Sequence, residues 1–343
     1  MLKPISNPPS PWESTHVEYL GEPPDARLEV FEEEAGSILA ENESPDVGFR
    51  WSINPYRGCF HACAYCYSRT SHEYLGFGAG TDFDRKIVVK VNSPELLRAQ
   101  LSRRSWKGET IIFSGNTDCY QPLEAVYELT RRCLEVCAEF RNPVAIITKG
   151  ALVRRDVDLL ARMSREGSAS VALSIPFSDD AMSRAIEPNA SLPSQRFETL
   201  RLLSEAGIST GVGVAPVIPG LNDSQISEVL ERARAAGATS AFMTLIRLAG
   251  QTLPVFRERL ELALPDRANK VWSAIQQTRG GKFNESQFGL RMRGVGPRWD
   301  AIHSLFDVEC RRLGFNKERV GEQEEETTFR RPGAQRNLFG PER

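Results

Sequence analysis

The strongest constraint on the fold is an alternation of short buried segments with amphipathic helical patterns through the middle of the chain. Each buried segment is β-branched or continuously apolar and is bounded by turn residues, which is typical of a strand in a parallel sheet. Helical patterns lie between them, and Asn222, Asp223 and Ser224 predict an N-cap for the last one. This order predicts an α/β fold, either a doubly wound open sheet or a full or partial β/α barrel. The predicted strands span residues 49–54, 109–115, 142–149, 168–175, 208–217 and 239–248, and the helices span 122–140, 154–166, 191–207 and 221–237.

Polar residues gather where several of these strands end. In both candidate architectures, ligands bind at the carboxyl ends of the parallel strands. Lys149 closes a continuous apolar strand, where its ammonium either extends into solvent or binds an anion. Taken singly, each of the others is explained at least as well as a turn or capping residue. The polar residues at the strand ends are Ser114, Asn116, Thr117, Asp118, Lys149, Ser174 and Arg247.

Three of the seven cysteines lie together in a loop after the first predicted strand. Cys59, Cys63 and Cys66 have the spacing C-x3-C-x2-C, and the odd total favours metal binding or catalysis over disulfides. Structural zinc needs four ligands, but the pair Cys133 and Cys137 lies on an apolar helical pattern and is better explained by core packing. A cube held by three cysteines instead of the usual four would keep one iron open. The loop therefore predicts an open iron–sulfur site or a zinc site.

The composition is that of an ordinary globular protein. Of 343 residues, 41% are hydrophobic and 26% are charged, and no apolar run approaches the roughly 20 residues of a membrane-spanning helix. The N-terminus lacks the basic-then-apolar order of a secretory signal, so we expect a cytoplasmic protein without membrane partners. The formal net charge of −2 gives no global attraction to nucleic acid.

One segment, residues 270–298, is nevertheless basic. It carries six Lys or Arg residues against one Glu, a net charge of +5, with Trp272, Phe283 and Phe288 among them. Basic residues interleaved with aromatic residues can hold a nucleic-acid backbone and stack on bases. A solvated charged face with packing aromatic residues is the plainer explanation, and both stay open.

Several motifs together resemble a known superfamily. The cysteine spacing with an aromatic residue before the last cysteine, Tyr65 before Cys66, is similar to that of the radical S-adenosylmethionine (SAM) superfamily. Longer stretches resemble its spore photoproduct lyase-like branch, often labelled DNA repair photolyases, and within it a bacterial subgroup of unassigned function. The resemblance covers residues 45–315, and the stretches are "NPYRGCFHACAYCYSRTSHEYLG", "FSGNTDCYQPLE", "VAPVIPGLND" and "RGGKF...FGLRMRGVG".

This resemblance implies a partial (β/α)6, TIM-like barrel with a [4Fe-4S] cluster at its open mouth. Cys59, Cys63 and Cys66 would each hold one iron, and the amine and carboxylate of SAM would bind the fourth. Reductive cleavage of SAM would give a 5′-deoxyadenosyl radical that abstracts a hydrogen atom from the substrate. A flavodoxin or ferredoxin is the expected electron donor.

The resemblance also assigns SAM-binding roles. Tyr65 would flank the adenine, and Thr117 and Asp118, with Asn116, would bind the SAM amino group. Lys149 would pair with the SAM carboxylate.

The resemblance assigns roles to Ser174 and Arg247 less firmly, and at one position this chain differs from spore photoproduct lyase. Ser174 would contact the ribose, and Arg247 would neutralise SAM or substrate at the barrel rim. Spore photoproduct lyase carries a hydrogen-donating cysteine just before the SAM-binding positions, where this chain has Ser114 and Gly115. The nearest thiol is Cys119, which we take as a candidate catalytic hydrogen donor or as an unreactive loop cysteine.

Three functions remain open at this stage. They are a radical SAM enzyme acting on nucleic acid, a radical SAM enzyme acting on a peptide, protein or small molecule, and a non-enzymatic zinc-binding module. The expected organisation is an N-terminal, partly disordered arm (1–45), the core barrel (46–250), a C-terminal helical extension covering the barrel (251–315) and a disordered charged tail (316–343).

Overall fold

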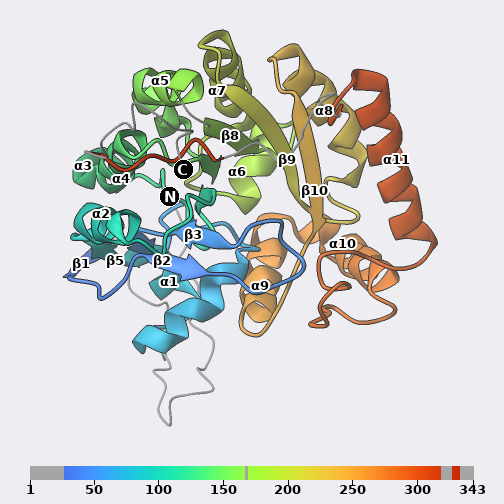
Figure 1. Ribbon diagram of the computed structural model, residues 1–343. Coiled ribbons are helices and arrows are strands. Elements are labelled where there is room, and N and C mark those ends of the chain that lie inside the picture. The colour runs from blue at the N-terminus through green and yellow to red at the C-terminus, as the bar shows by residue number, and fades with distance from the viewer. Residues whose placement is uncertain (1–26, 167–168, 318–326, 333–343) are drawn as a thin grey trace.

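Six parallel strands form the centre of the computed structural model, which describes residues 27–166, 169–317 and 327–332 (Figure 1). They follow the order β10-β9-β8-β7-β6-β3, and β2 adds to β3 as an antiparallel edge. All six predicted strands are confirmed, and among the described residues the sheet is open, as in a partial (β/α)6 barrel. The strands are β2 (Leu39–Glu41), β3 (Trp51–Ile53), β6 (Ile111–Phe113), β7 (Val144–Thr148), β8 (Ala169–Ser174), β9 (Ser209–Val217) and β10 (Ser240–Leu245).

Helices connect successive strands on the outside of this sheet (Figure 1). The helix predicted over residues 122–140 is divided, because Glu128 adopts a left-handed φ of 51°. The divided helix comprises α3 (Glu124–Tyr127) and α4 (Leu129–Glu139). The other connecting elements are the 3-10 helices η2 (Ala151–Asp156) and η3 (Asp223–Gln225) and the helices α5 (Val157–Glu166), α6 (Asp180–Ile186), α7 (Pro193–Glu205) and α8 (Ile226–Ala235).

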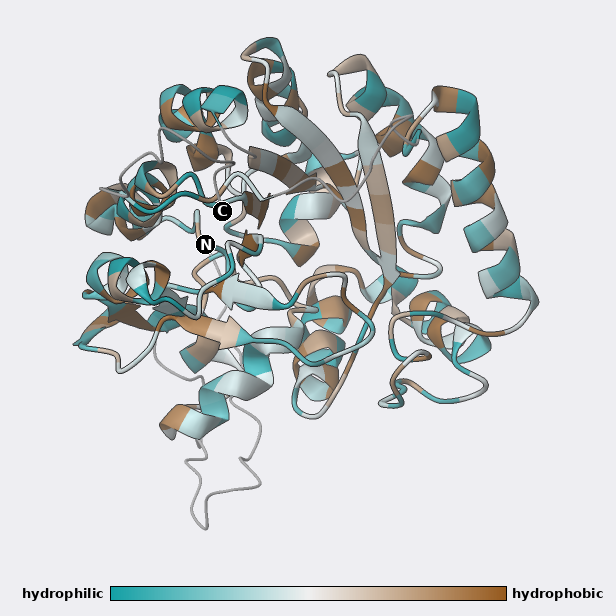
Figure 2. Cartoon of the chain, viewed as in Figure 1, coloured by the Kyte–Doolittle hydropathy of each residue, from teal (hydrophilic) through white to brown (hydrophobic). Residues whose placement is uncertain are grey.

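The core lies between the sheet and these helices. Strand residues such as Ile111, Phe113, Val171 and Leu173 are buried, which explains their continuous apolar sequence, since parallel strands are covered on both faces. In Figure 2 the outer helices carry bands of both apolar and hydrophilic colour, as expected for helices that turn one face to the core and the other to solvent.

A second, small sheet lies beside the cysteine loop and was not predicted. Its order is β1-β5-β4, with β5 parallel to β1 and antiparallel to β4. Residues 27–45 of the expected arm contribute two strands, β1 and β2, which both belong to sheets; residues 1–26 lie outside the described residues. The additional elements are β1 (Glu29–Glu33), β4 (Tyr56–Arg57), β5 (Lys86–Lys90), η1 (Tyr67–Leu75), α1 (Thr81–Arg85) and α2 (Ser93–Ser102).

Three helices follow the last strand: α9 (Thr252–Ala263), α10 (Pro265–Thr278) and α11 (Pro297–Leu313). The outer side of β10 is covered by chain from this region. The Asn316 side chain accepts from the Ala241 N–H (2.9 Å) and donates to the Ala241 carbonyl (2.8 Å), and the Leu245 N–H donates to the Met292 carbonyl (3.3 Å). No helix among the described residues is long and apolar enough to cross a membrane.

Part of the expected disordered tail packs on the fold. The Phe329 ring stacks on Phe140, with 6.2 Å between ring centroids. The Thr327 hydroxyl donates to the Gly108 carbonyl (2.6 Å). For residues 327–332 the expectation of disorder is therefore wrong; residues 318–326 and 333–343 lie outside the described residues.

Candidate active site

The cysteine loop follows β3 and β4 and runs into η1. Two turns shape it, with the Ala62 N–H donating to the Cys59 carbonyl (3.2 Å) and the Cys66 N–H donating to the Cys63 carbonyl (3.3 Å). The Cys59 N–H donates to the Phe83 carbonyl (3.0 Å), which fixes the start of the loop.

Gly58 allows the loop to begin in this position. Its φ is +77°, in the left-handed region that favours glycine. A Cβ atom there would lie 2.9 Å from the Phe83 carbonyl oxygen and 2.9 Å from the Ile87 Cδ1 atom. The close approach of this backbone to α1 and β5 therefore requires glycine.

The three cysteine thiols are free and close enough to affect one another. Cys59 and Cys63 are buried and Cys66 is partly exposed. Burial, the Asp118 carboxylate and the other two cysteines raise the pKa of Cys59 well above its usual value. Burial and Glu187 raise the pKa of Cys63 to about 12, against the opposing effect of Lys149. Burying the Cys59 and Cys63 thiols is costly for their charged forms, whereas a bound metal deprotonates cysteines and binds the thiolates.

Three cysteine thiols are a donor set that an iron–sulfur cluster can use. Among the described residues, no group of three or more His, Cys, Asp or Glu side chains is arranged to hold one metal ion. In an iron–sulfur cube each cysteine binds a different iron, so the thiolates need not converge on one point. Cys59, Cys63 and Cys66 would hold three of the four irons.

Behind Tyr65 lies a buried ion pair that the sequence analysis did not find. The Tyr65 hydroxyl donates to Glu187, whose carboxylate also accepts from Arg196 (2.5 Å) and from the Ser183 hydroxyl (3.0 Å). The side chains of Glu187 and Arg196 are both 0% exposed. Burial alone would raise the pKa of Glu187, but Arg196, Lys149 and the Tyr65 hydroxyl lower it overall. The carboxylate is ionised and fixes the Tyr65 ring.

Lys149 lies at the end of β7, as predicted, with its ammonium 5.6 Å from the centroid of the Tyr65 ring. Its backbone N–H donates to Asp118 (2.7 Å). The structure thus brings Lys149, Tyr65 and the cysteine loop together.

The Asp118 carboxylate already accepts hydrogen bonds from other groups of the protein. Its carboxylate accepts from the Thr148 hydroxyl (2.6 Å) and from the Tyr120 N–H (2.9 Å), and lies 3.3 Å from His61 Nδ1. Burial would raise the pKa of Asp118, but His61 and the hydrogen bonds from Lys149 and Thr148 lower it strongly overall. Asp118 therefore joins β6, β7 and the cysteine loop.

Three other predicted SAM-binding residues also have protein partners. The Thr117 hydroxyl donates to the Tyr56 carbonyl (2.6 Å), and the Ser174 hydroxyl donates to the Ala215 carbonyl (2.8 Å). The Asn116 N–H donates to the Asn54 side chain (2.8 Å).

Arg247 lies just beyond β10, with its guanidinium 5.9 Å from the centroid of the Tyr67 ring. The Arg247 Nε is buried and has no hydrogen-bond partner within the described part of the chain. Burial and the nearby Arg291 lower the pKa of Arg247. It is a partly buried cation at the sheet's carboxyl edge.

Cys119 is 1% exposed, and its backbone N–H donates to the Ser114 hydroxyl (2.8 Å). Burial, Asp118 and Glu124 raise the pKa of its thiol well above the usual value. Cys119 is therefore held as a neutral thiol.

The basic segment 270–298 docks on the end of β10. Arg279 is 5% exposed and donates to the carbonyls of Ile246 (2.7 Å) and Arg293 (2.7 Å), so it is a structural residue. Arg291 pairs with Asp46, Arg298 with Asp223 and Lys282 with Glu285. The Trp272 and Phe283 rings pack against each other, with 5.4 Å between centroids. Most of the +5 charge is therefore paired or buried, in agreement with the plainer explanation.

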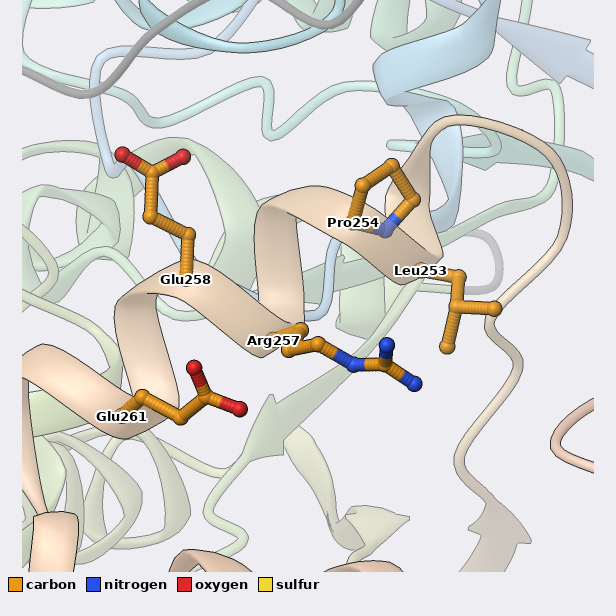
Figure 3. Close-up of a pocket in the computed structure, with 5 residues that line it drawn as sticks. All are labelled: Leu253, Pro254, Arg257, Glu258 and Glu261. Atoms are coloured by element: carbon orange, nitrogen blue, oxygen red, sulfur yellow. The ribbon is translucent and has the colours of Figure 1, made fainter.

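Figure 3 shows a surface hollow of about 300 Å³ on α9. None of its lining residues is a predicted site residue. They are Leu253, Pro254, Arg257, Glu258 and Glu261.

Comparison with known proteins agrees with this geometry. The family model of the radical SAM superfamily matches residues 53–233. An uncharacterized protein of Mycobacterium tuberculosis is 39% identical over 232 residues, covering 66% of this chain and 68% of the relative. A radical SAM Nalpha-GlyT isomerase of Pseudomonas phage M6 is 26% identical over 264 residues, 76% of this chain and 51% of that protein.

Among solved structures, the fold is similar to spore photoproduct lyase complexed with dinucleoside spore photoproduct. The TM-score is 0.61 at 15% identity, covering 83% of this chain and 80% of that chain. The family match, which contains the whole cysteine loop, agrees with the predicted resemblance. The chain belongs to the radical SAM superfamily.

Proposed function

We propose that Cys59, Cys63 and Cys66 hold three irons of a [4Fe-4S] cluster and that SAM binds the fourth. The observation that supports this most directly is the grouping of three buried or half-buried free thiols beside the carboxyl ends of parallel strands. When bound, the cluster supplies one electron that cleaves SAM to methionine and a 5′-deoxyadenosyl radical, which takes a hydrogen atom from the substrate. A flavodoxin or ferredoxin is the proposed electron donor.

The surrounding residues would bind SAM and exclude water. Tyr65, fixed by Glu187, would pack against the adenine, and Lys149 beside it would pair with the SAM carboxylate. Ser174 would contact the ribose and Arg247 would neutralise SAM or substrate at the rim.

The SAM amino group would be bound at the end of β6, by Asn116, Thr117 and Asp118. Their side chains or N–H groups already have protein partners. The carbonyls of Asn116 and Asp118 also accept hydrogen bonds, from the Ser68 hydroxyl (2.6 Å) and the Gln121 N–H (3.4 Å), so we favour the Thr117 carbonyl as the acceptor for the SAM amino group. Cys119 would be the hydrogen donor, because it is the thiol adjacent in the chain to the proposed SAM-binding residues Thr117 and Asp118.

Anaerobic reconstitution tests the cluster. We expect about four irons and four sulfides per chain and, with dithionite, formation of 5′-deoxyadenosine. Cys63→Ala should abolish this cleavage, whereas Cys310→Ala, a change in α11, should retain it. Full cleavage by Cys63→Ala would refute the assignment. The zinc-binding module is not retained, because the chain belongs to an enzyme superfamily.

For the substrate, we propose nucleic acid. This is supported by the shared fold with spore photoproduct lyase over 83% of the chain and by the two basic residues of the segment that remain exposed, Lys270 and Arg293. Binding to oligonucleotides should weaken steeply with salt, since each neutralised phosphate contributes a slope of about −0.7 to −0.9. Replacing the exposed Lys270 and Arg293 by Gln should reduce that slope.

One observation favours the alternative substrate, a peptide, protein or small molecule. Arg279, Arg291 and Arg298 of the basic segment are committed to protein carbonyls or carboxylates, which leaves little free charge for phosphates. SAM cleavage with no oligonucleotide binding at low salt would select this alternative.

A further inference from the structure

Two arginines, one buried and one partly buried, hydrogen-bond to the backbone of the cysteine loop. Arg69, which is 0% exposed, donates from Nε (3.2 Å) and Nη2 (2.8 Å) to the Cys63 carbonyl. Its Nη1 donates to the carbonyls of Ala79 (3.0 Å) and Gly80 (2.9 Å). The second arginine, Arg259, donates to the Ala62 carbonyl. Adjacent peptides of the loop are therefore fixed by separate guanidinium groups.

One carboxylate joins the two arginines. Asp84, whose side chain is 3% exposed, accepts from Arg69 Nη2 at 2.8 Å through Oδ1 and from Arg259 through Oδ2. Two guanidinium groups and one carboxylate leave a net charge of +1. Because the group is removed from water, this charge is poorly screened and acts strongly on its neighbours. We call Arg69, Asp84 and Arg259 the arginine clamp.

The clamp connects the loop to a helix beyond the barrel strands. Arg259 lies on α9, and burial and Arg69 lower its pKa, whereas Asp84 and the Cys63 thiol raise it. Arg257, two residues earlier, points to the exposed side of the same helix, toward the hollow in Figure 3. A step of two residues turns a helix by about 200°, which separates the two guanidinium groups onto opposite faces.

We propose that the arginine clamp positions the Cys63 peptide and sets the reduction potential of the cluster on Cys59, Cys63 and Cys66. The inference rests on the proposed function. A cluster gains one negative charge when it accepts an electron, so a fixed buried excess of one positive charge stabilises the reduced form. Arg69, Asp84 and Arg259 are positioning residues, since they act through the backbone of the cysteine loop and through one another.

The test is a redox titration of the reconstituted protein with dithionite, in which the amount of reduced cluster is measured by its electron paramagnetic resonance signal. Arg259→Gln removes one positive charge, and at a fixed potential the ratio of reduced to oxidised cluster should fall about tenfold, a shift of about 59 mV. Asp84→Asn removes the negative charge, and the ratio should rise by a similar factor. Arg257→Gln, the matched control on the exposed face of α9, should titrate like wild type.

The opposite directions separate an electrostatic role from a structural one. If both clamp variants shift the potential in the same direction, or neither differs from Arg257→Gln, the proposal is wrong. If both fail to load a cluster while Arg257→Gln loads one, the clamp is purely structural and the electrostatic assignment is overturned. If only Arg259→Gln fails to bind a cluster, Arg259→Lys, which keeps the charge, is titrated in its place. The proposal is then supported if Asp84→Asn has a raised ratio of reduced to oxidised cluster and Arg259→Lys has the wild-type ratio. Any other result refutes the proposal. A wild-type protein that binds no cluster would refute the proposed function instead.

Discussion

Replacing Glu187 by Gln tests the buried ion pair behind Tyr65. The substitution keeps the shape of the side chain but removes its charge, and it leaves Arg196 as a cation with 0% exposure. Removing one partner of a buried pair typically costs about 3 to 5 kcal/mol. The Gln carbonyl can still accept one of the hydrogen bonds now made by Tyr65, Ser183 and Arg196, so we expect a loss near the lower limit, about 3 kcal/mol.

Glu198→Gln is the matched control, because Glu198 also pairs with an arginine, Arg201. Those side chains are 45% and 46% exposed, and such surface pairs contribute about 0 to 1 kcal/mol. The free energy of unfolding is measured by urea titration at pH 7 with far-UV circular dichroism, and the slope against urea should be unchanged. A loss below about 1 kcal/mol for Glu187→Gln, equal to that of the control, would show that the pair is not buried as described.

Three further predictions concern stability. Burial lowers the pKa of His72 to about 4 from 6.5, against weaker opposing effects of neighbouring groups. As the pH falls, the unfolded chain therefore binds a proton at His72 before the folded chain does, and the free energy of unfolding should fall by about 2 kcal/mol between pH 7.5 and 5. Urea titrations of His72→Gln should lack this part of the loss, whereas those of the exposed His303→Gln should retain it. Gly58→Ala should cost about 2 kcal/mol and reduce the iron content after reconstitution, because of its positive φ and the 2.9 Å contacts; Gly36→Ala, where a Cβ would meet nothing within 4 Å, should do neither. Arg279→Met removes buried hydrogen bonds to several carbonyls, and the thermal midpoint should fall with a loss of about 3 kcal/mol; an unchanged midpoint would contradict its structural role.

The main sheet could be predicted because each of its strands has a recognisable local sequence pattern. The segments that became β6 to β10 are apolar enough to indicate burial on both faces, and turn residues bound them. In the small sheet only β5, with the sequence KIVVK, has such a signal. Strand β1 has the sequence EVFEE and is almost entirely exposed, and β4 has only two residues. The pairing of β1 with β5 depends on a contact between residues such as Phe31 and Val88, which no local pattern specifies.

In the candidate site, too, some residues could be predicted from local sequence and others could not. The cysteine spacing and Lys149 could be found from sequence, because motif and strand end are local features. The partners that fix them are distant: Glu187 lies 122 residues from Tyr65, and Arg259 lies 175 residues from Asp84. The sequence does not show which arginine pairs with which acidic residue, so these buried pairs could not be told from surface ion pairs.

Asn222 shows a further limit. Asn222 lies at the N-cap position of η3, as the run of residues 222–224 predicts, but its side chain makes no capping hydrogen bond. It accepts from the Ile218 N–H (2.6 Å) and donates to the carbonyls of Pro176 (2.7 Å) and Pro216 (3.0 Å). The same side chain suits both uses, and only the folded backbone decides between them.

An incomplete barrel has two free edges, and an exposed edge strand is a template on which another chain can add. Here β2 occupies one edge, and the Asn316 side chain and the Met292 carbonyl occupy backbone groups along the other. The segments just outside the barrel therefore protect both edges of the sheet against edge-to-edge pairing with another chain.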